Sequence, residues 1–338
     1  MLAFLKWTAS GHQEFRLGGM AGTGKTTLIK AMRKHMGNCQ VVTPTAKAAE
    51  VLQQKEVPAK TIHSQFFKFN RKTKGADGRE ELIFDPKKKH VHFIIVDESS
   101  MVAEKTYDVI KAYSKRVVWV GDHFQLQPVD PGGNSDFQVL NENNLDAELT
   151  ENHRVGSKHL LDFAMVLRRG GDPSDFECDY DSVSIYPMSP HPECMANEML
   201  RSNIWPVIAS TNEYCGDFNA AIRRGMGFKQ FGLEEGLRIV CKRNSYQWPS
   251  VNGQTFTVKR VFDHEKIETE CGKIFPVSFS EYEKGVVLIE DGYALTCHKA
   301  QGSEWSHIAA IENRGETPPW QYTAVTRAQN KLIYFTKD

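Results

Sequence analysis

The sequence has no run of about 18 apolar residues, which excludes a membrane-spanning helix. Its opening stretch, MLAFLKWTASGHQEF, lacks the long apolar core and the small-residue cleavage site of a secretory signal peptide. We therefore expect a cytoplasmic protein with no membrane partner. The seven cysteines form no CxxC pair and no Cys/His cluster with zinc-ligand spacing, so we expect reduced thiols rather than a disulfide framework or a zinc site.

An excess of charge of one sign is also missing, because 42 Lys and Arg residues balance 42 Asp and Glu residues. The overall charge provides no basic footprint for nucleic acid, so any such site has to be local. A content of 40% hydrophobic and 25% charged residues is ordinary for globular proteins, and 338 residues are enough for two core domains.

Glycine is concentrated in one short stretch, GGMAGTGKTT at residues 18–27. It contains the spacing G-x-x-x-x-G-K-T, in which backbone N–H groups converge on phosphate oxygens at a helix N-terminus. A strand-like EFRL precedes it and apolar residues at helical spacing follow it, which favours a phosphate loop over a merely flexible loop. Lys25 is expected at the β- and γ-phosphates and the Thr26 hydroxyl on Mg²⁺. The predicted nucleotide-binding residues of this loop are Gly19, Gly22, Thr23, Gly24, Lys25, Thr26 and Thr27.

A second stretch, HFIIVDESSM, complements the phosphate loop. Its apolar run predicts a buried parallel strand that delivers Asp97 and Glu98 to its carboxyl end, where such sheets bind ligands. Asp97 is suited to the Mg²⁺ shell together with Thr26, and Glu98 is suited to activate the attacking water as a general base. The alternative is an ordinary acidic pair at a strand end.

Six further segments extend the pattern over nearly the whole chain, and in order and wording they resemble the superfamily 1 DNA helicases. The resemblance is greatest to the 5′-to-3′ branch that contains RecD and the small phage helicase Dda. The segments are VVTPTAKAAEVL (41–52), TIHS (61–64), VGDHFQLQPV (120–129), LTENHR (149–154), LTCHKAQGSEW (295–305) and YTAVTRAQNKL (322–332).

The resemblance implies an α/β fold of two tandem RecA-like P-loop domains, with ATP hydrolysed between them. We expect the first lobe at residues 1–146 and the second at 147–338. The stretch WPVIASTNEYCGDFNAAIRR supports a structural repeat, because it has the order strand, polar turn and helix found also in VVTPTAKAAEVL.

Two insertions are expected in these lobes. Residues 66–90 predict a strand, a turn and a strand, which the resemblance makes a β-hairpin pin whose Phe66 and Phe69 meet the duplex junction. A β-ribbon whose Phe residues pack on the parent lobe is the alternative. From about 237 to 287, short alternating segments separated by turn residues predict a small β-barrel, which is SH3-like in relatives.

The resemblance also assigns roles to single residues. Gln125 is expected to sense the γ-phosphate, Arg154 and Arg327 to neutralise charge as the phosphoryl group departs, and Glu304 to contact the ribose. With Lys25 and Glu98, the first three complete the expected catalytic set. The expected nucleic-acid contacts are Pro44, Thr45, His63, Phe66, Phe69, Asn212, Thr296 and His298. For Thr45 and His63, a simple helix cap and a buried polar histidine remain the alternatives.

The activity that the resemblance implies is an ATP- and Mg²⁺-dependent DNA helicase or translocase that moves 5′ to 3′ on single-stranded DNA and acts at junctions with duplex. It also implies a monomer of the phage or bacterial cytosol, with replication or recombination proteins as further partners. Two alternatives stay open, a nucleotide-gated motor subunit of a larger recombination complex and a P-loop ATPase that acts on RNA.

An adenine-reading glutamine is missing, because relatives place it ahead of a helix and a strand that lead to the phosphate loop. Gln13 lies only six residues before Gly19, which leaves no room for both elements. Either the true start lies upstream of Met1, or base recognition has been given up. In the second case we expect GTP to be used within about tenfold of ATP.

Overall fold

The computed structural model divides the chain into two compact units, Met1–Arg154 and Val155–Asp338. We expected the boundary between residues 146 and 147, which is earlier in the chain than the observed one. Residues after 146 belong to the first unit because the strand Ala147–Leu149 pairs with the strand of that unit that ends at Gly19. The structure describes residues 1–74, 80–87, 90–128, 137–153, 158–189, 191–245, 247–248, 250–262, 266–280, 285–312 and 316–337, without the side chains of residues 69 and 71–84.

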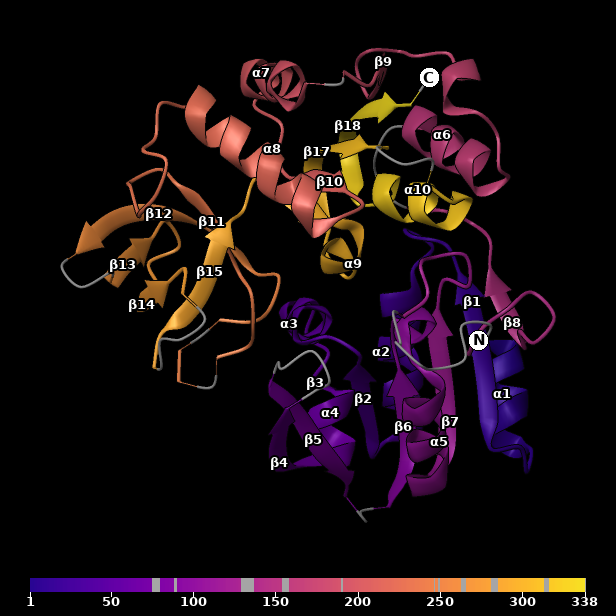
Figure 1. The fold of residues 1–338 in the computed structure, drawn as a ribbon. Helices are drawn as coiled ribbons and strands as arrows, with labels where there is room; N and C mark the ends of the chain where they lie inside the picture. The colour runs from indigo at the N-terminus through magenta and orange to yellow at the C-terminus, as the bar shows by residue number, and fades with distance from the viewer. Residues whose placement is uncertain are drawn as a thin grey trace. The chain divides into compact units, whose positions relative to one another are not determined.

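The first unit is built on a six-stranded parallel sheet with the order β3-β2-β6-β7-β1-β8 (Figure 1). Its strands are β1 (Glu14–Gly19), β2 (Cys39–Thr43), β3 (Ala59–Thr61), β6 (Val91–Val96), β7 (Ser114–Gly121) and β8 (Ala147–Leu149). Its helices are α1 (Leu2–Ala9), α2 (Lys25–Met36), α3 (Ala46–Gln54), α4 (Ile62–Phe66) and α5 (Glu104–Tyr113), with a 3₁₀ turn at Ser99–Met101.

Helices cover both faces of this sheet, because its central strands are apolar on both sides. Ile95 packs with side chains of α1, α2 and α3 on one face, whereas its neighbours Ile94 and Val96 pack with side chains of α4 and α5 on the other. Alternate residues of one strand therefore anchor two separate cores, as in doubly wound α/β domains.

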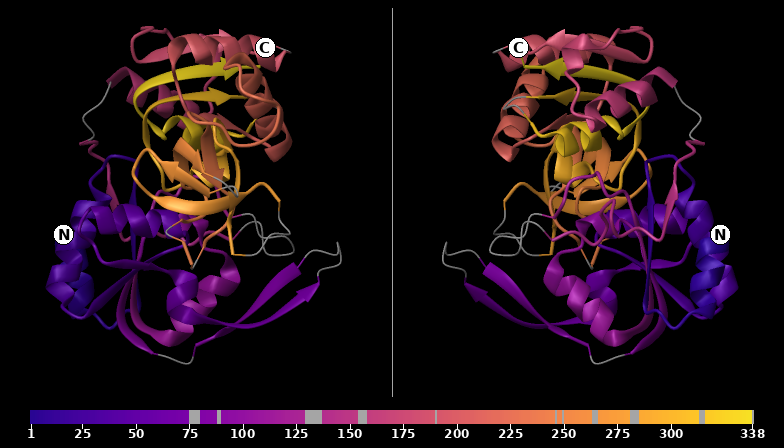
Figure 2. Two further views of the ribbon diagram at one scale, coloured as in Figure 1. Left: turned by 90° about the vertical axis from the view of Figure 1, so that its left-hand side faces the viewer. Right: turned by 90° about the vertical axis from the view of Figure 1, so that its right-hand side faces the viewer.

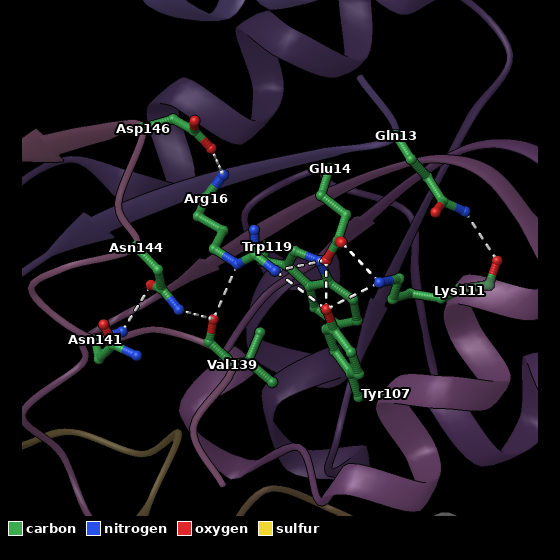
Figure 3. A network of polar contacts seen from close by, with 10 residues as sticks. All are labelled: Gln13, Glu14, Arg16, Tyr107, Lys111, Trp119, Val139, Asn141, Asn144 and Asp146. Atoms are coloured by element: carbon green, nitrogen blue, oxygen red, sulfur yellow. Dashed lines mark hydrogen bonds and ion pairs between the residues drawn. The ribbon is translucent and has the colours of Figure 1, made fainter. Parts of the chain in front are cut away.

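A polar network fixes the beginning of β1 beneath α5 (Figure 3). The Glu14 carboxylate accepts hydrogen bonds from the Tyr107 hydroxyl at 2.8 Å, the Trp119 indole at 3.0 Å and the Arg16 guanidinium at 2.8 Å. The Lys111 ammonium lies 2.9 Å from its other oxygen. One carboxylate thus joins β1, β7 and α5.

Gln13, just before β1, has a structural role in the same region. Its amide donates hydrogen bonds to the carbonyl oxygens of Lys111 at 3.0 Å and Ser114 at 2.8 Å. These carbonyls lie at the C-terminal end of α5, where helix carbonyls need partners from outside the helix.

A two-stranded antiparallel ribbon of β4 (Phe67–Lys74) and β5 (Glu80–Pro86) extends from the first unit (Figure 2). The expectation that Phe66 belongs to its DNA-contacting surface is wrong. Phe66 is the last residue of α4 and is 1% exposed, packed in a core with Val42, Ile62 and Trp119. A side chain held there cannot stack on a base pair. The side chain of Phe69 lies outside the described residues.

The second unit contains a five-stranded parallel sheet with the order β16-β10-β17-β18-β9. The strands are β9 (Val183–Pro187), β10 (Val207–Ala209), β16 (Ala294–Thr296), β17 (Trp305–Ile311) and β18 (Ala328–Thr336). The helices are α6 (Lys158–Arg168), α7 (Pro192–Ser202), α8 (Asn212–Gly225), α9 (Cys297–Ala300) and α10 (Pro318–Val325), with a 3₁₀ turn at Pro173–Asp175.

A closed barrel is inserted between α8 and β16 of this unit. Its strands are β11 (Arg238–Cys241), β12 (Thr255–Phe262), β13 (Lys266–Thr269), β14 (Ile274–Ser278) and β15 (Val287–Asp291). Arg223 of α8 holds its last strand, with a 2.6 Å ion pair to Asp291. Directly after the last barrel strand, position 292 has to be a glycine because the backbone of Ile239 lies very close. A Cβ at position 292 would lie 2.6 Å from the carbonyl carbon of Ile239.

Within the described part of the chain, no helix combines the length and the apolar character that crossing a bilayer requires.

Candidate functional site

The phosphate loop connects β1 to α2 at the carboxyl edge of the first sheet. Gly22 and Gly24 have φ values of 80° and 83°, in the left-handed region that favours glycine. Gly19 allows a close approach, because a Cβ on it would lie 2.8 Å from the Thr23 hydroxyl oxygen. That hydroxyl donates a 2.8 Å hydrogen bond to the carbonyl of Met20. Each of these three predicted glycines is therefore needed for the backbone conformation of the loop, through its positive φ or the close approach that it allows.

Lys25 begins α2, and its ammonium group folds back over the loop. It donates hydrogen bonds of 2.8 Å to the carbonyl oxygens of both Gly19 and Met20. Thr26 is half-buried and Thr27 is exposed in the first helical turn, which contains no acidic residue. The helix N-terminus thus presents its N–H groups and partial positive charge without a competing carboxylate.

Asp97 and Glu98 follow β6 at the same edge, as the sequence predicts. Asp97 is 8% exposed, and its backbone N–H donates a 2.9 Å hydrogen bond to the carbonyl of Val42. Burial and the neighbouring Glu98 charge raise the pKa of the Asp97 carboxyl, while the charge of Lys25 opposes the rise. A carboxylate and the hydroxyl of Thr26 are hard oxygen ligands of the kind that Mg²⁺ prefers, so these residues fit the ion that the resemblance implies.

Gln125 lies in the turn that follows β7. It is 3% exposed, and its side-chain oxygen is buried without a hydrogen-bond partner in the described structure. Its position is fixed through the backbone, since its N–H donates to the carbonyl of Asp122 at 3.2 Å. A buried amide oxygen that lacks a partner is unusual in proteins and is a candidate contact for a bound group or water.

Two residues that sequence reasoning missed also contact the phosphate loop. The side-chain amide of Asn152 donates a 2.9 Å hydrogen bond to the carbonyl of Ala21, and the backbone N–H of His153 donates a 2.9 Å hydrogen bond to the carbonyl of Gly22. Both lie in the segment LTENHR, but the sequence does not show this contact, because it depends on β8 pairing with a strand about 130 residues earlier. Arg154, the next residue, lies outside the described residues.

Arg327 is in the interior of the second unit, just after α10, and is 3% exposed. Its guanidinium donates to the carbonyls of Thr323 at 3.0 Å and Ser303 at 3.3 Å, and to the hydroxyl of Thr326 at 3.1 Å. Three of the five N–H donors are therefore used within this unit. Glu304, expected at the ribose, is exposed.

Four helices share one arrangement that bears on the expected nucleic-acid contacts. Thr45, Thr61, Thr211 and Thr296 each precede a helix and accept a hydrogen bond from the backbone N–H three residues later, at 3.1 to 3.4 Å. Thr45 and Thr211 follow β2 and β10, whereas Thr61 and Thr296 are the last residues of β3 and β16. These are the two strands at one edge of each sheet. Each unit thus presents a pair of Thr-capped helix N-termini at adjacent strand ends. We call these four residues the threonine caps.

The other expected nucleic-acid residues lie beside these caps. Asn212 is exposed in the first turn of α8, directly after the cap Thr211. His63 is exposed in α4, and its ring lies 5.2 Å from that of Phe67. Pro44 directly precedes Thr45, and half-buried His298 lies in α9 after Thr296.

Residues 3–185 match a family profile described as an AAA domain, and residues 291–334 match one described as a UvrD-like helicase C-terminal domain. The chain is 25% identical to the ATP-dependent RecD2 DNA helicase of Deinococcus radiodurans, covering 96% of this chain and 47% of the relative. It is 24% identical to the ATP-dependent DNA helicase Pif1 of Bdellovibrio bacteriovorus, covering 95% and 83%.

The fold has a solved counterpart in the crystal structure of Bacteroides Pif1 bound to ssDNA, with a TM-score of 0.62 and 18% identity. The match covers 99% of this chain and 91% of that one. It supports the α/β architecture with two parallel sheets. The chain spans 30% to 47% of the length of some curated relatives that it matches.

Proposed function

We propose that this chain, which belongs to the AAA-domain family, is an ATP-driven motor that moves along single-stranded DNA and separates duplex DNA. Its resemblance to the superfamily 1 DNA helicases is confirmed by the UvrD-like C-terminal match and by relatives named RecD2 and Pif1. The observation that carries the proposal is the occurrence of paired threonine caps at one edge of both parallel sheets, in a chain that also has a phosphate loop.

The nucleotide chemistry is assigned to the first unit. The phosphate loop and Lys25 bind the β- and γ-phosphates of ATP, and Glu98 accepts the proton of the attacking water. Thr26 and Asp97 would hold Mg²⁺, which supplies charge neutralisation at the phosphates when it is bound. Gln125 is placed by its sequence context to respond to the γ-phosphate, and its partnerless oxygen supports that role.

Arg154 and Arg327 are proposed to neutralise charge that develops as the γ-phosphoryl group departs. Glu304 is proposed to contact the ribose. The support for these three assignments is the sequence context of each residue in the segments LTENHR, YTAVTRAQNKL and LTCHKAQGSEW.

The threonine caps are proposed to bind DNA phosphates, together with Pro44, His63, Asn212 and His298. A helix N-terminus beside a hydroxyl that can still donate its proton is suited to an anion, because the N–H groups of the first helical turn and the helix dipole both favour negative charge. If each unit binds the strand and the distance between the two binding sites changes during ATP turnover, the chain would step along the DNA. We assign the direction 5′ to 3′ by family resemblance.

Two insertions are proposed to act on the duplex. The β4–β5 ribbon is suited to be the pin at the junction, since it extends from the first unit (Figure 2). The closed barrel β11–β15 is proposed to be the SH3-like element of the family and to lie near the bound strand.

The test uses the purified chain alone. ATP hydrolysis should rise severalfold with oligo-dT, and a duplex with a 5′ single-stranded tail should be unwound whereas one with a 3′ tail should not. A rate of ATP hydrolysis that is the same with and without DNA would refute the coupling of hydrolysis to DNA binding. Unwinding of the 3′-tailed duplex alone would refute the 5′-to-3′ direction. ATPase activity that appears only with oligoribonucleotides would point to RNA instead.

A further inference from the structure

The carbonyl oxygens of residues 19–22 in the phosphate loop all accept hydrogen bonds, some from donors within residues 19–25 and some from a segment about 130 residues later. The four carbonyls at 19–22 each accept at least one hydrogen bond from a side chain or from a distant backbone N–H. Lys25 donates to the first two, and the Thr23 hydroxyl also donates to the second. The amide of Asn152 donates to the third and the backbone N–H of His153 donates to the fourth. These carbonyls thus have hydrogen-bond partners within the protein before any nucleotide binds.

These two kinds of donor respond differently to a nucleotide. The ammonium of Lys25 has to turn from the carbonyls of Gly19 and Met20 toward the phosphates when a nucleotide binds, because it is the charge that neutralises them. The amide of Asn152 and the backbone N–H of His153 carry no charge that a phosphate would attract, and they donate to the carbonyls of Ala21 and Gly22, which Lys25 does not contact. In the bound state they therefore remain as partners of the loop carbonyls after Lys25 has left.

The position of this segment is well determined by the sheet. Leu149 of β8 pairs with Gly19 of β1, so the chain enters the loop region alongside the strand that leads into it. The His153 ring then lies against Gly24, since its Cδ2 would be 3.8 Å from a Cβ at that position. Residues 149–153 thus run from the strand to the far end of the phosphate loop. We call Asn152 and His153 the loop strap.

We propose that the loop strap holds the phosphate loop in its nucleotide-binding shape, with Asn152 as the positioning residue that acts through the carbonyl of Ala21. The inference rests on the proposed use of ATP by this site. It assigns to Asn152 an effect on nucleotide affinity rather than on the chemical step, because its side chain donates to the loop and not to the phosphates.

The experiment compares three variants of the full chain, Asn152→Ala, Asn152→Gln and the matched control Asn143→Ala, which alters an exposed asparagine of the same unit. Binding of a fluorescent ADP analogue is measured without DNA, and kcat and KM for ATP are measured with saturating oligo-dT. Loss of one hydrogen bond should weaken ADP binding and raise KM by about fivefold in Asn152→Ala, with kcat within about twofold of wild type. Asn152→Gln retains a donor and should recover part of the affinity, while Asn143→Ala should match wild type.

Several results would contradict the role proposed for the loop strap. If Asn152→Ala binds ADP as tightly as the wild type does, Asn152 has no role in nucleotide binding. A fall in kcat at constant KM would show a role in chemistry instead of positioning. If Asn152→Ala lowers the melting temperature of the nucleotide-free protein and Asn152→Gln restores stability but not affinity, the role is structural only. Failure of wild type itself to bind ADP would refute the proposed function rather than the strap.

Discussion

Asp97 and Glu98 are neighbours in the chain, yet the structure holds them in different ways. Asp97 ends a buried strand and lies in the interior, where burial raises the pKa of its carboxyl. Glu98 is half-exposed and has a φ of 52°, which is rare for a residue with a side chain. Strained backbone of this kind concentrates at functional sites. The two carboxylates are thus separated into an interior position suited to a cation and an accessible position suited to water.

This separation predicts different effects of removing each charge. Glu98→Gln keeps the size of the side chain and should bind ATP with nearly wild-type affinity, but it should lower kcat by about 100-fold or more, because the amide cannot accept a proton from water. Steady-state kinetics with oligo-dT and equilibrium binding of an ATP analogue measure the two quantities. Turnover within about threefold of wild type would show that another residue activates the water. Glu104→Gln, at the start of α5, is the matched control.

The threonine caps predict that DNA binding is local and sensitive to salt. Thr296→Ala should weaken binding of oligo-dT by about fivefold, because it removes a hydroxyl next to a phosphate-binding helix N-terminus. For the wild-type chain, the logarithm of affinity should fall with the logarithm of salt concentration by about 0.7 per neutralised phosphate. Thr317→Ala is a suitable control, since Thr317 precedes α10 without capping it through its side chain. Affinity that does not change with salt would contradict phosphate binding at the caps.

Changes in the β4–β5 ribbon and at Phe66, just before it, should have different effects, the first on unwinding and the second on the stability of the first unit. Replacing residues 70–80 by a tight turn should abolish unwinding while ATPase activity with single-stranded DNA stays within about twofold of wild type, because the nucleotide residues lie on other elements. Phe66→Ala should instead destabilise the first unit by about 3 to 5 kcal/mol, as expected for a fully buried aromatic. Unwinding assays and urea unfolding distinguish the two. Unwinding that survives the shortened ribbon would make the ribbon structural.

Much of the fold and site could be predicted because the decisive signals are local in the sequence. The phosphate loop, the Asp97–Glu98 pair and the alternating short strands of the barrel each lie within a few dozen residues. Phe66 was misassigned because the Phe-rich stretch looks continuous with a strand, whereas burial against Trp119 depends on a residue 53 positions later. The loop strap could not be predicted for the same reason. In the Ser-Thr-Asn turn at 210–212, all three residue types favour helix caps, so composition could not select Thr211.

The Glu14 network predicts a pH-dependent stability of the first unit (Figure 3). Burial tends to raise the pKa of Glu14, but hydrogen bonds from Lys111 and Tyr107 and the charge of Arg16 outweigh it, so the pKa is lowered. An acid whose pKa is lowered on folding stabilises the protein above its unfolded pKa of about 4.3, and this contribution is lost as pH falls through the folded value.

Glu14→Gln should therefore lower the free energy of unfolding by about 1 to 2 kcal/mol at pH 7, because the ionised acceptor of several hydrogen bonds is lost. The difference from wild type should shrink as the pH falls below the unfolded pKa, since protonation then removes the same charge from wild type. Urea unfolding at pH 7 and at about pH 3.5 measures this, with exposed Glu148→Gln as the control. A difference that is equal at both pH values would mean that the shape of the side chain, and not its charge, stabilises β1 beneath α5.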